Sequence, residues 1–369
     1  MVRTEKSVHS NREVARAHRP ASLRRAWPIV LSLLATAATL SCGTEEKSTS
    51  NTSTPPAAST PQTYVYVASG TAYAGNGITP ATATNTIVRY TTAGVFDRIV
   101  RDYTNSPGDS PIAMVNYSTT TILVLVENTS SRRIEEVAKD GSSYSTFLSN
   151  GTALSAQLRS LALSADGGFL VSKGTAIEKF NSSKTRITVG ANPFINAPAS
   201  TCGTSTTLSP DIAVHSSGNI VMAHAAASPN NQVNYISKNG YTTTADCLSV
   251  VEGASANHFP TAVHIHSGGK LLVGYSNNTG PVHQIYSYDL SSTAITAAAV
   301  AYNDTSVLQG ISEIAAGPDG SVLVAASAPA LNTIEKFTIS GATLSRVGTS
   351  TFIGPSVFTK SVTSILTTE

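Results

Sequence analysis

The sequence predicts an all-β protein, a six-bladed β-propeller with four antiparallel strands per blade, from three observations. A glycine turn followed by an apolar strand recurs at a constant spacing, because Gly167, Gly218, Gly269 and Gly320 are each 51 residues from the next. The 306 residues from 64 to 369 are six times 51. Each unit also contains four short β patterns, and four-stranded units that repeat in this way are typical of a propeller.

The four strands of a unit have different residue patterns. The first is a short apolar segment such as Leu161-Ala-Leu. A glycine turn then reverses the chain, because glycine accepts the positive φ of a tight hairpin. The second strand is almost continuously apolar, which is typical of a strand buried on both faces. The third alternates, as in Ile177-Glu-Lys-Phe and Ile334-Glu-Lys-Phe, and a polar Ser/Thr-rich strand closes the unit.

The two ends of the repeat region predict how the ring closes. The first unit begins at Tyr64 with a second-strand pattern and lacks a first strand. The last segment, Ser361–Glu369, has a first-strand pattern with no second strand after it. We therefore expect the C-terminal strand to complete the N-terminal blade, which would also protect the sheet edges of both.

The residues before the repeats have the layout of an export signal. Residues 1–27 carry seven basic and two acidic side chains, and residues 28–40 form an apolar segment too short to cross a bilayer comfortably. The following Thr39-Leu-Ser-Cys42 resembles a bacterial lipobox, which implies acylation of Cys42. We expect a signal peptide over 1–41, an acylated Cys42 with a flexible tether over 42–62, and the propeller over 63–369. An ordinary cleaved signal, with Cys42 incidental, is the alternative.

Composition and charge exclude several classes of protein. The whole chain has a formal charge of +2, with 24 Lys and Arg against 22 Asp and Glu. The basic excess belongs to the export signal, so the chain from Cys42 onward is slightly acidic. No basic cluster follows the signal, which argues against a nucleic-acid partner. The chain also lacks the G-x-S-x-G, H-E-x-x-H, C-x-x-C and P-loop motifs.

The pattern of the repeats consists of a strand, an Asp-Gly turn, an apolar strand and a strand of the Ile-x-Lys-Phe type. This pattern resembles the NHL-repeat and SMP-30-like six-bladed propellers over residues 64–369. These families include binding scaffolds, sugar-lactone hydrolases and RNA binders, because one fold hosts many activities. We expect a monomeric, non-catalytic binding scaffold, anchored by lipid in the bacterial envelope at the outer membrane or cell surface. Its partner would be an envelope or extracellular protein or a glycan. A metal-dependent lactonase of the gluconolactonase type is the alternative.

The resemblance to lactonases implies a divalent ion, Ca²⁺ or another, held by acidic and amide side chains at the channel mouth. Asp211 and Glu313 lie at similar strand starts, 102 residues or two repeats apart. The alternative for both acids is a structural role at strand ends. No catalytic residue is predicted. Three histidines are further candidates for binding a metal: His224, His258 and His283. The candidates for a binding loop are Tyr73 and Asn76 of the long 71–86 loop, together with Asn277 and Asn278.

The remaining cysteines and histidines suggest structural roles. Cys202 and Cys247 form an even pair in an exported chain, which predicts a disulfide, with buried free thiols as the alternative. His264 stands where other repeats have alanine, so we expect it to pack between blades. His215 and His266 occupy equivalent hairpin positions. Because no His-x-His pair combined with an acid is evident from the spacing, the sequence favours core or surface roles for these side chains.

Overall fold

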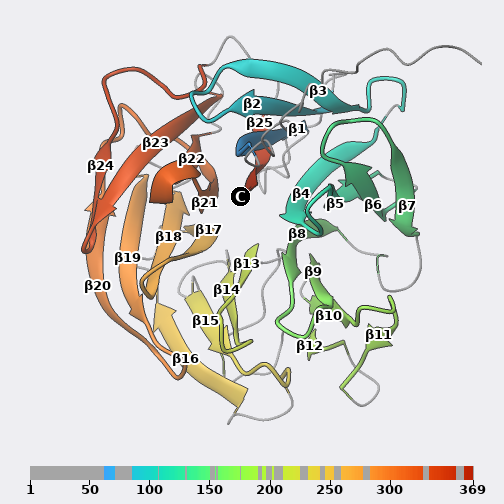
Figure 1. Ribbon diagram of the computed structural model, residues 1–369. Coiled ribbons are helices and arrows are strands. Elements are labelled where there is room, and N and C mark those ends of the chain that lie inside the picture. Colours follow the sequence, from blue (N-terminus) through green and yellow to red (C-terminus); the bar gives the residue numbers. More distant parts are fainter. Residues whose placement is uncertain are drawn as a thin grey trace, which may run out of the picture. The chain divides into compact units, whose positions relative to one another are not determined.

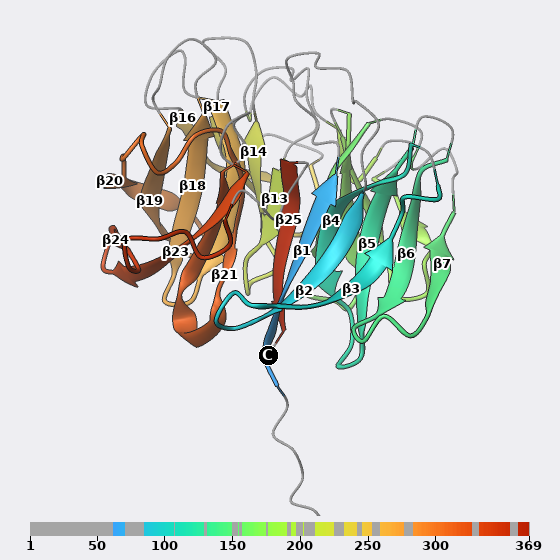
Figure 2. The same ribbon diagram turned by 90° about the horizontal axis from the view of Figure 1, so that it is seen from above.

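Six antiparallel sheets stand in a ring in the computed structural model of the protein, which confirms the predicted six-bladed propeller (Figure 1). The structure describes residues 62–70, 85–106, 108–128, 131–149, 154, 157–174, 176–189, 193–196, 202, 211–224, 232–241, 246–252, 259–276, 283–326, 332–354 and 361–368. In the view turned by 90°, the strands run between the two faces of the ring (Figure 2). No helix in this part of the chain is long and apolar enough to cross a membrane.

The first three blades contain the following strands, given from the channel outward. Blade one has β25 (Ser361–Thr368), β1 (Tyr64–Gly70), β2 (Thr86–Thr91) and β3 (Phe96–Asp102). Blade two has β4 (Ser110–Asn116), β5 (Thr121–Glu127), β6 (Arg133–Ala138) and β7 (Tyr144–Leu148). Blade three has β8 (Leu158–Leu163), β9 (Phe169–Lys173), β10 (Ala176–Phe180) and β11 (Arg186–Ile187), and β12 (Ile195–Asn196) also pairs with β10.

The last three blades repeat the same order. Blade four has β13 (Asp211–Val214), β14 (Ile220–His224), β15 (Gln232–Ile236) and β16 (Cys247–Glu252). Blade five has β17 (Phe259–His266), β18 (Lys270–Ser276), β19 (Gln284–Leu290) and β20 (Ile295–Tyr302). Blade six has β21 (Ile311–Ala316), β22 (Val322–Ala326), β23 (Thr333–Ser340) and β24 (Thr343–Arg346), with the short 3₁₀ turn η3 (Pro318–Gly320) between β21 and β22.

The glycine turns that define the repeat have the backbone conformation expected of them. Gly167, Gly218, Gly269 and Gly320 have φ values of 80°, 89°, 78° and 68°. This left-handed region is costly for most other residues, because their Cβ atom meets the backbone. The 51-residue spacing of these glycines therefore marks the hairpins between the first and second strands of blades three to six.

Ring closure takes place as the chain ends predict. β25 pairs with β1 in an antiparallel register that includes Tyr64 with Thr368 and Val67 with Ile365. The Tyr64 amide also donates to the Thr368 hydroxyl over 3.2 Å. Val67, Val362 and Ile365 lie in one apolar cluster with side chains of blade six. The last strand therefore completes the first blade and joins it to its neighbour.

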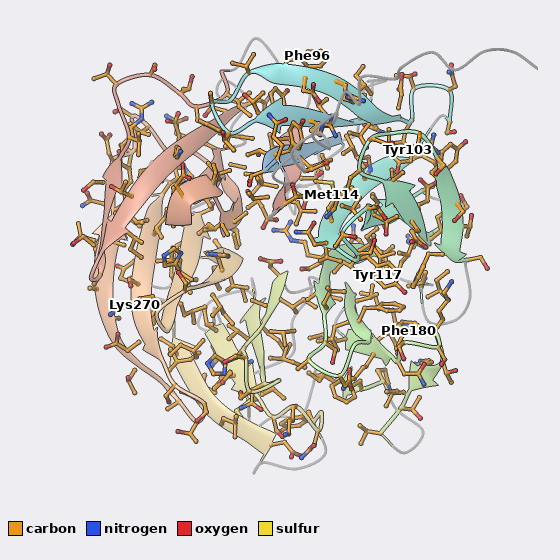
Figure 3. The ribbon with its side chains drawn as sticks, in the orientation of Figure 1. Phe96, Tyr103, Met114, Tyr117, Phe180 and Lys270 are labelled. Carbon is orange, nitrogen blue, oxygen red and sulfur yellow. A yellow bond between two sulfur atoms is a disulfide. The ribbon has the colours of Figure 1, made fainter. Side chains whose placement is uncertain are left out.

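The second strands are buried on both faces, as their continuous apolar sequences predict. On β5, Leu123 and Leu125 pack against blade three, whereas Ile122 and Val124 pack against blade one. All four side chains are completely buried. The outer strands differ, since Phe96 of β3 lies at the rim and is 57% exposed (Figure 3). The core thus consists of apolar layers between neighbouring blades.

The structure contains the disulfide between Cys202, which lies between β12 and β13, and Cys247 on the outer strand β16. The two Cα atoms are 5.5 Å apart and the residues are separated by 45 positions. A link of this length restricts the unfolded chain and adds about 2–4 kcal/mol of stability. We expect the double variant Cys202→Ala, Cys247→Ala to lower the free energy of unfolding in urea by that amount.

A reducing agent provides the control for this disulfide prediction. Dithiothreitol should lower the stability of the wild-type protein to the level of the double variant and should leave the double variant unchanged. Equal urea midpoints for the oxidised wild type and the double variant would contradict the prediction.

Candidate functional site

Four of the inner strands carry a polar side chain at the same position of the repeat. Thr261, Ser312 and Thr363 lie on β17, β21 and β25 at successive intervals of 51 residues, and Arg159 on β8 lies 102 residues before Thr261. Their hydrogen bonds join inner strands of different blades: Thr261 Oγ1 donates to the Ile311 carbonyl (2.7 Å), Ser312 Oγ to Val362 (2.8 Å), Thr363 Oγ1 to Pro111 (2.7 Å) and Arg159 Nη2 to Thr261 (2.7 Å). These polar side chains therefore fasten the ring.

The next residue of the repeat forms further links between blades on β8 and β13. Asp211 Oδ2 accepts a hydrogen bond of 2.8 Å from the Val263 amide of the following blade. The Ser160 hydroxyl accepts one from the Ile212 amide in the same way, at 3.3 Å. Asp211 is thus engaged in holding blade four to blade five, which is close to the structural alternative that its sequence position allowed.

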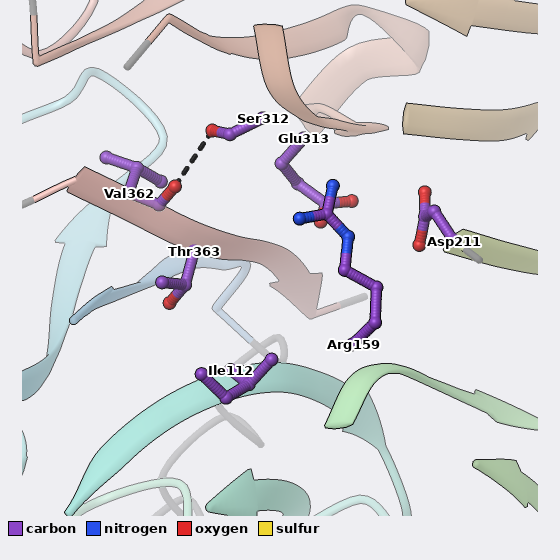
Figure 4. A pocket seen from close by; sticks show the side chains of 7 residues that line it. All are labelled: Ile112, Arg159, Asp211, Ser312, Glu313, Val362 and Thr363. Carbon is purple, nitrogen blue, oxygen red and sulfur yellow. Dashed lines mark hydrogen bonds between the residues drawn. The ribbon is translucent and has the colours of Figure 1, made fainter. Parts of the chain in front are cut away.

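Asp211 and Glu313 come together beside Arg159, as the two-repeat spacing of the acids suggests (Figure 4). The cavity that these three side chains line has a volume of about 20 Å³. Ile112, Ser312, Val362 and Thr363 complete its lining. This volume holds about one water molecule. The space between these side chains is therefore small.

Burial dominates the electrostatics of the two acids. It raises the pKa of Glu313 well above its usual range, and the neighbouring Asp211 charge raises it further, while Arg159 acts in the opposite direction. Burial also raises the pKa of Asp211, against the effects of Arg159 and of the Ser160 and Val263 hydrogen bonds. Glu313 thus keeps its proton to higher pH than an exposed glutamate does.

The acid pair does not fit the divalent-ion site of a lactonase-like enzyme. Among the described residues that line this cavity only two are carboxylates, Asp211 is already bound by the Val263 amide, and the Arg159 cation lies beside both. Across the described ranges, no group of three or more His, Cys, Asp or Glu side chains is placed to hold a metal ion. We therefore derive no metal-dependent step from Asp211 and Glu313.

Among the other sequence candidates for the site, the structure describes the side chain of His283. His283 lies apart from the cavity, where its Nδ1 accepts a hydrogen bond of 3.1 Å from the Gly310 amide. The side chain of His224 is outside the part of the chain that the structure describes. The same holds for the residues His258, Tyr73, Asn76, Asn277, Asn278 and Cys42.

A larger cavity, about 260 Å³ in volume, is lined by parts of blades five, six and one. His264 and His266 of β17 both line it, with ring centroids 6.0 Å apart. Burial lowers the pKa of His264 to about 4 and also lowers the pKa of His266. The repeat pattern does not reveal this pair, because it relates each histidine to the equivalent residues of other repeats, whereas His264-Ile-His266 is a His-x-His motif within one strand.

Comparison with known proteins shows the fold and no more. No family model matches the chain, and no curated protein matches it. A chain of a nidogen/laminin complex is similar over 83% of this chain and 98% of its own, at 10% identity and a TM-score of 0.58. A Bacteroides caccae protein of unknown function has the same coverage, with 14% identity and a TM-score of 0.51. A putative 6-phosphogluconolactonase of Bacteroides fragilis covers 85% of this chain and 100% of its own, with 11% identity and a TM-score of 0.50. At such identities these structures share a propeller architecture with this chain, and binding proteins and enzymes both use it.

Proposed function

We propose that this protein is a lipid-anchored envelope protein whose propeller binds a protein or glycan partner without catalysis. The observation that carries the proposal is the small space beside the two acids. The cavity there is about 20 Å³, and four of the polar side chains around it form bonds between blades: Arg159, Asp211, Ser312 and Thr363. A sugar lactone is many times larger than one water, so the space between Asp211 and Glu313 does not hold a substrate of that class.

The location follows from the N-terminal sequence. The basic segment, the short apolar segment and the lipobox-like Cys42 support export and acylation, and residues 42–62 supply a tether. The Cys202–Cys247 disulfide suits an oxidising compartment, where such bonds persist. The working protein would therefore present a rigid ring at the envelope surface.

Partner recognition is assigned to the loops that join second and third strands. The longest, over 71–86, is rich in Gly, Thr and Ala and contains Tyr73 and Asn76, and the loop after β18 contains Asn277 and Asn278. Long loops on a rigid scaffold often carry recognition. Uncharged hydroxyl and amide groups are suited to the hydrogen-bonding groups of glycans and peptide backbones.

A binding assay tests the proposed function, and a hydrolysis assay tests the lactonase alternative. The chain over 43–369 is compared with a variant in which residues 72–84 are replaced by a short Gly-Ser linker, using co-sedimentation with purified cell-wall glycan and envelope protein fractions. We expect binding by the wild type and at least a tenfold loss in the loop variant. Glu313→Gln should bind as the wild type does, because Glu313 lies in the channel.

The lactonase alternative makes the opposite prediction. Hydrolysis of sugar lactones that requires Ca²⁺ or Zn²⁺ and disappears in Glu313→Gln would contradict the proposed function. Equal binding by the loop variant and the wild type would contradict the assignment of recognition to the 71–86 loop.

A further inference from the structure

Two histidines of the inner strand β17 lie side by side on one face. His264 and His266 are two positions apart on an antiparallel strand, so their side chains point in the same direction. Their ring centroids are 6.0 Å apart with an interplanar angle of 60°. Two imidazoles at this separation can bind one metal ion, because each metal–nitrogen bond is about 2.0–2.1 Å and the ring centre lies just over 1 Å beyond the nitrogen.

Both rings line the 260 Å³ cavity, which has room for an ion and several waters. Asp319 also lines it and contributes negative charge, whereas the described lining contains no Lys or Arg. Ser267 and Ser321 add hydroxyl groups. A cation in this cavity therefore meets no positive side chain from the part of the chain that the structure describes, and hydroxyl oxygens lie in the same lining as the imidazoles.

The hydrogen bonding of His264 adds an independent observation. Its Nε2 atom is buried and has no hydrogen-bond partner among the described residues. A buried polar atom without a partner is destabilising relative to a satisfied one, so native proteins usually give it a partner. Asn219 and His215 show the usual case, since Asn219 Nδ2 donates to the Ser292 carbonyl and His215 Nδ1 is 2.8 Å from Ser217 Oγ.

We infer that His264 and His266 form a binding site for a divalent transition-metal ion in this cavity. Imidazole nitrogens suit Zn²⁺, Cu²⁺ and Ni²⁺, whereas Ca²⁺ and Mg²⁺ prefer oxygen. With two protein ligands, the remaining coordination positions belong to water or to donor atoms of an incoming ligand. The site is distinct from the Asp211–Glu313 pair and does not depend on the proposed binding function.

Isothermal titration of Zn²⁺ into the untagged chain over 43–369 at neutral pH tests the site. We expect one ion per chain, a weakening of at least tenfold in His264→Gln and in His266→Gln, and loss of binding in the double variant. His215→Gln is the matched control, because His215 is the corresponding hairpin residue of blade four and has no histidine beside it; it should bind Zn²⁺ as the wild type does. Ca²⁺ should give no titration at this site.

Cu²⁺ provides a readout that does not depend on how well the variants fold. The electron paramagnetic resonance spectrum of one equivalent of Cu²⁺ in the wild-type protein should show hyperfine coupling to imidazole nitrogens. Three results would each overturn the inference. The first is a spectrum without nitrogen coupling, and the second is the absence of Zn²⁺ binding at 100 µM, a concentration on the order of the dissociation constant of a weak site. The third is equal Zn²⁺ affinity in the wild type and a folded double variant.

Discussion

Removal of the C-terminal strand is expected to abolish cooperative folding. A chain that ends at residue 360 lacks β25, which pairs with β1 along its length and borders the channel beside β4 and β21. The truncation removes Val362 and Ile365, whose exposed fractions are 0% and 4%. The burial of each side chain contributes about 1.5–3 kcal/mol to the free energy of unfolding. The hydrogen bonds between β25 and β1 are also lost, at about 0.5–1.5 kcal/mol each. The total loss of free energy of unfolding approaches the whole stability of a typical domain. Thermal unfolding by circular dichroism should show no cooperative transition at the wild-type midpoint.

The opposite end of the chain provides the control for this truncation. Removal of residues 1–60 leaves every described strand intact, so its thermal midpoint should equal that of the full chain. A synthetic peptide of Ser361–Glu369 should restore the transition when mixed with the truncated chain, because the pairing surface of β1 remains. A truncated chain that unfolds cooperatively at the wild-type midpoint would show that β25 does not close the ring.

The sequence could predict this closure because the relevant information repeats. Each glycine of the 51-residue series marks one hairpin, and the missing first strand before Tyr64 matches the surplus strand after Ser361. Six copies of one pattern also correct a misleading local sequence: Arg132-Arg-Ile-Glu-Glu-Val resembles a helix by itself, yet residues 133–138 form β6. Fold-level features are therefore set by short-range patterns that many copies reinforce.

The candidate sites were harder to predict because they depend on contacts between blades. The repeat placed Asp211 and Glu313 in equivalent positions, but not Arg159, which lies one position earlier in the repeat. Its signal was the polar series of Arg159, Thr261, Ser312 and Thr363, at multiples of 51 residues. Whether such a series binds a ligand or fastens the ring depends on which carbonyl each group reaches, and no periodicity specifies that.

Buried ion pairs are also difficult to predict from the sequence pattern of a single strand. The third strand of blade three alternates, which suggests an exposed Glu178, yet this side chain is completely buried. Arg186 binds it through two hydrogen bonds of 2.6 and 2.8 Å, and Lys173 lies 2.8 Å from it. A buried carboxylate is tolerable when its charge is paired in this way. The partners come from neighbouring strands, so the sequence of one strand could not identify them.

Replacement of Glu313 by glutamine is expected to stabilise the protein at alkaline pH. Burial and the Asp211 charge raise the pKa of Glu313 in the folded protein well above the value of about 4.5 for an exposed glutamate. The folded state therefore binds this proton more tightly than the unfolded state does. The stabilising contribution is complete below pH 4.5 and is lost as the pH rises through the folded-state pKa. Glutamine keeps the shape and removes the ionisation.

The measured quantity is the difference in free energy of unfolding between Glu313→Gln and the wild type, from urea titrations at several pH values between about 4 and 9. It should be near zero at the acid end and rise to about 1–3 kcal/mol in favour of the variant at the alkaline end, the usual cost of an unsatisfied buried polar group. Glu136→Gln, at a partly exposed position of β6, is the matched control and should show no such rise. A variant whose stability relative to the wild type falls as the pH rises would mean that the Glu313 carboxylate is held by favourable contacts. The channel would then be built to keep a negative charge, as an ion-binding enzyme requires, and the case for a non-catalytic channel would fail.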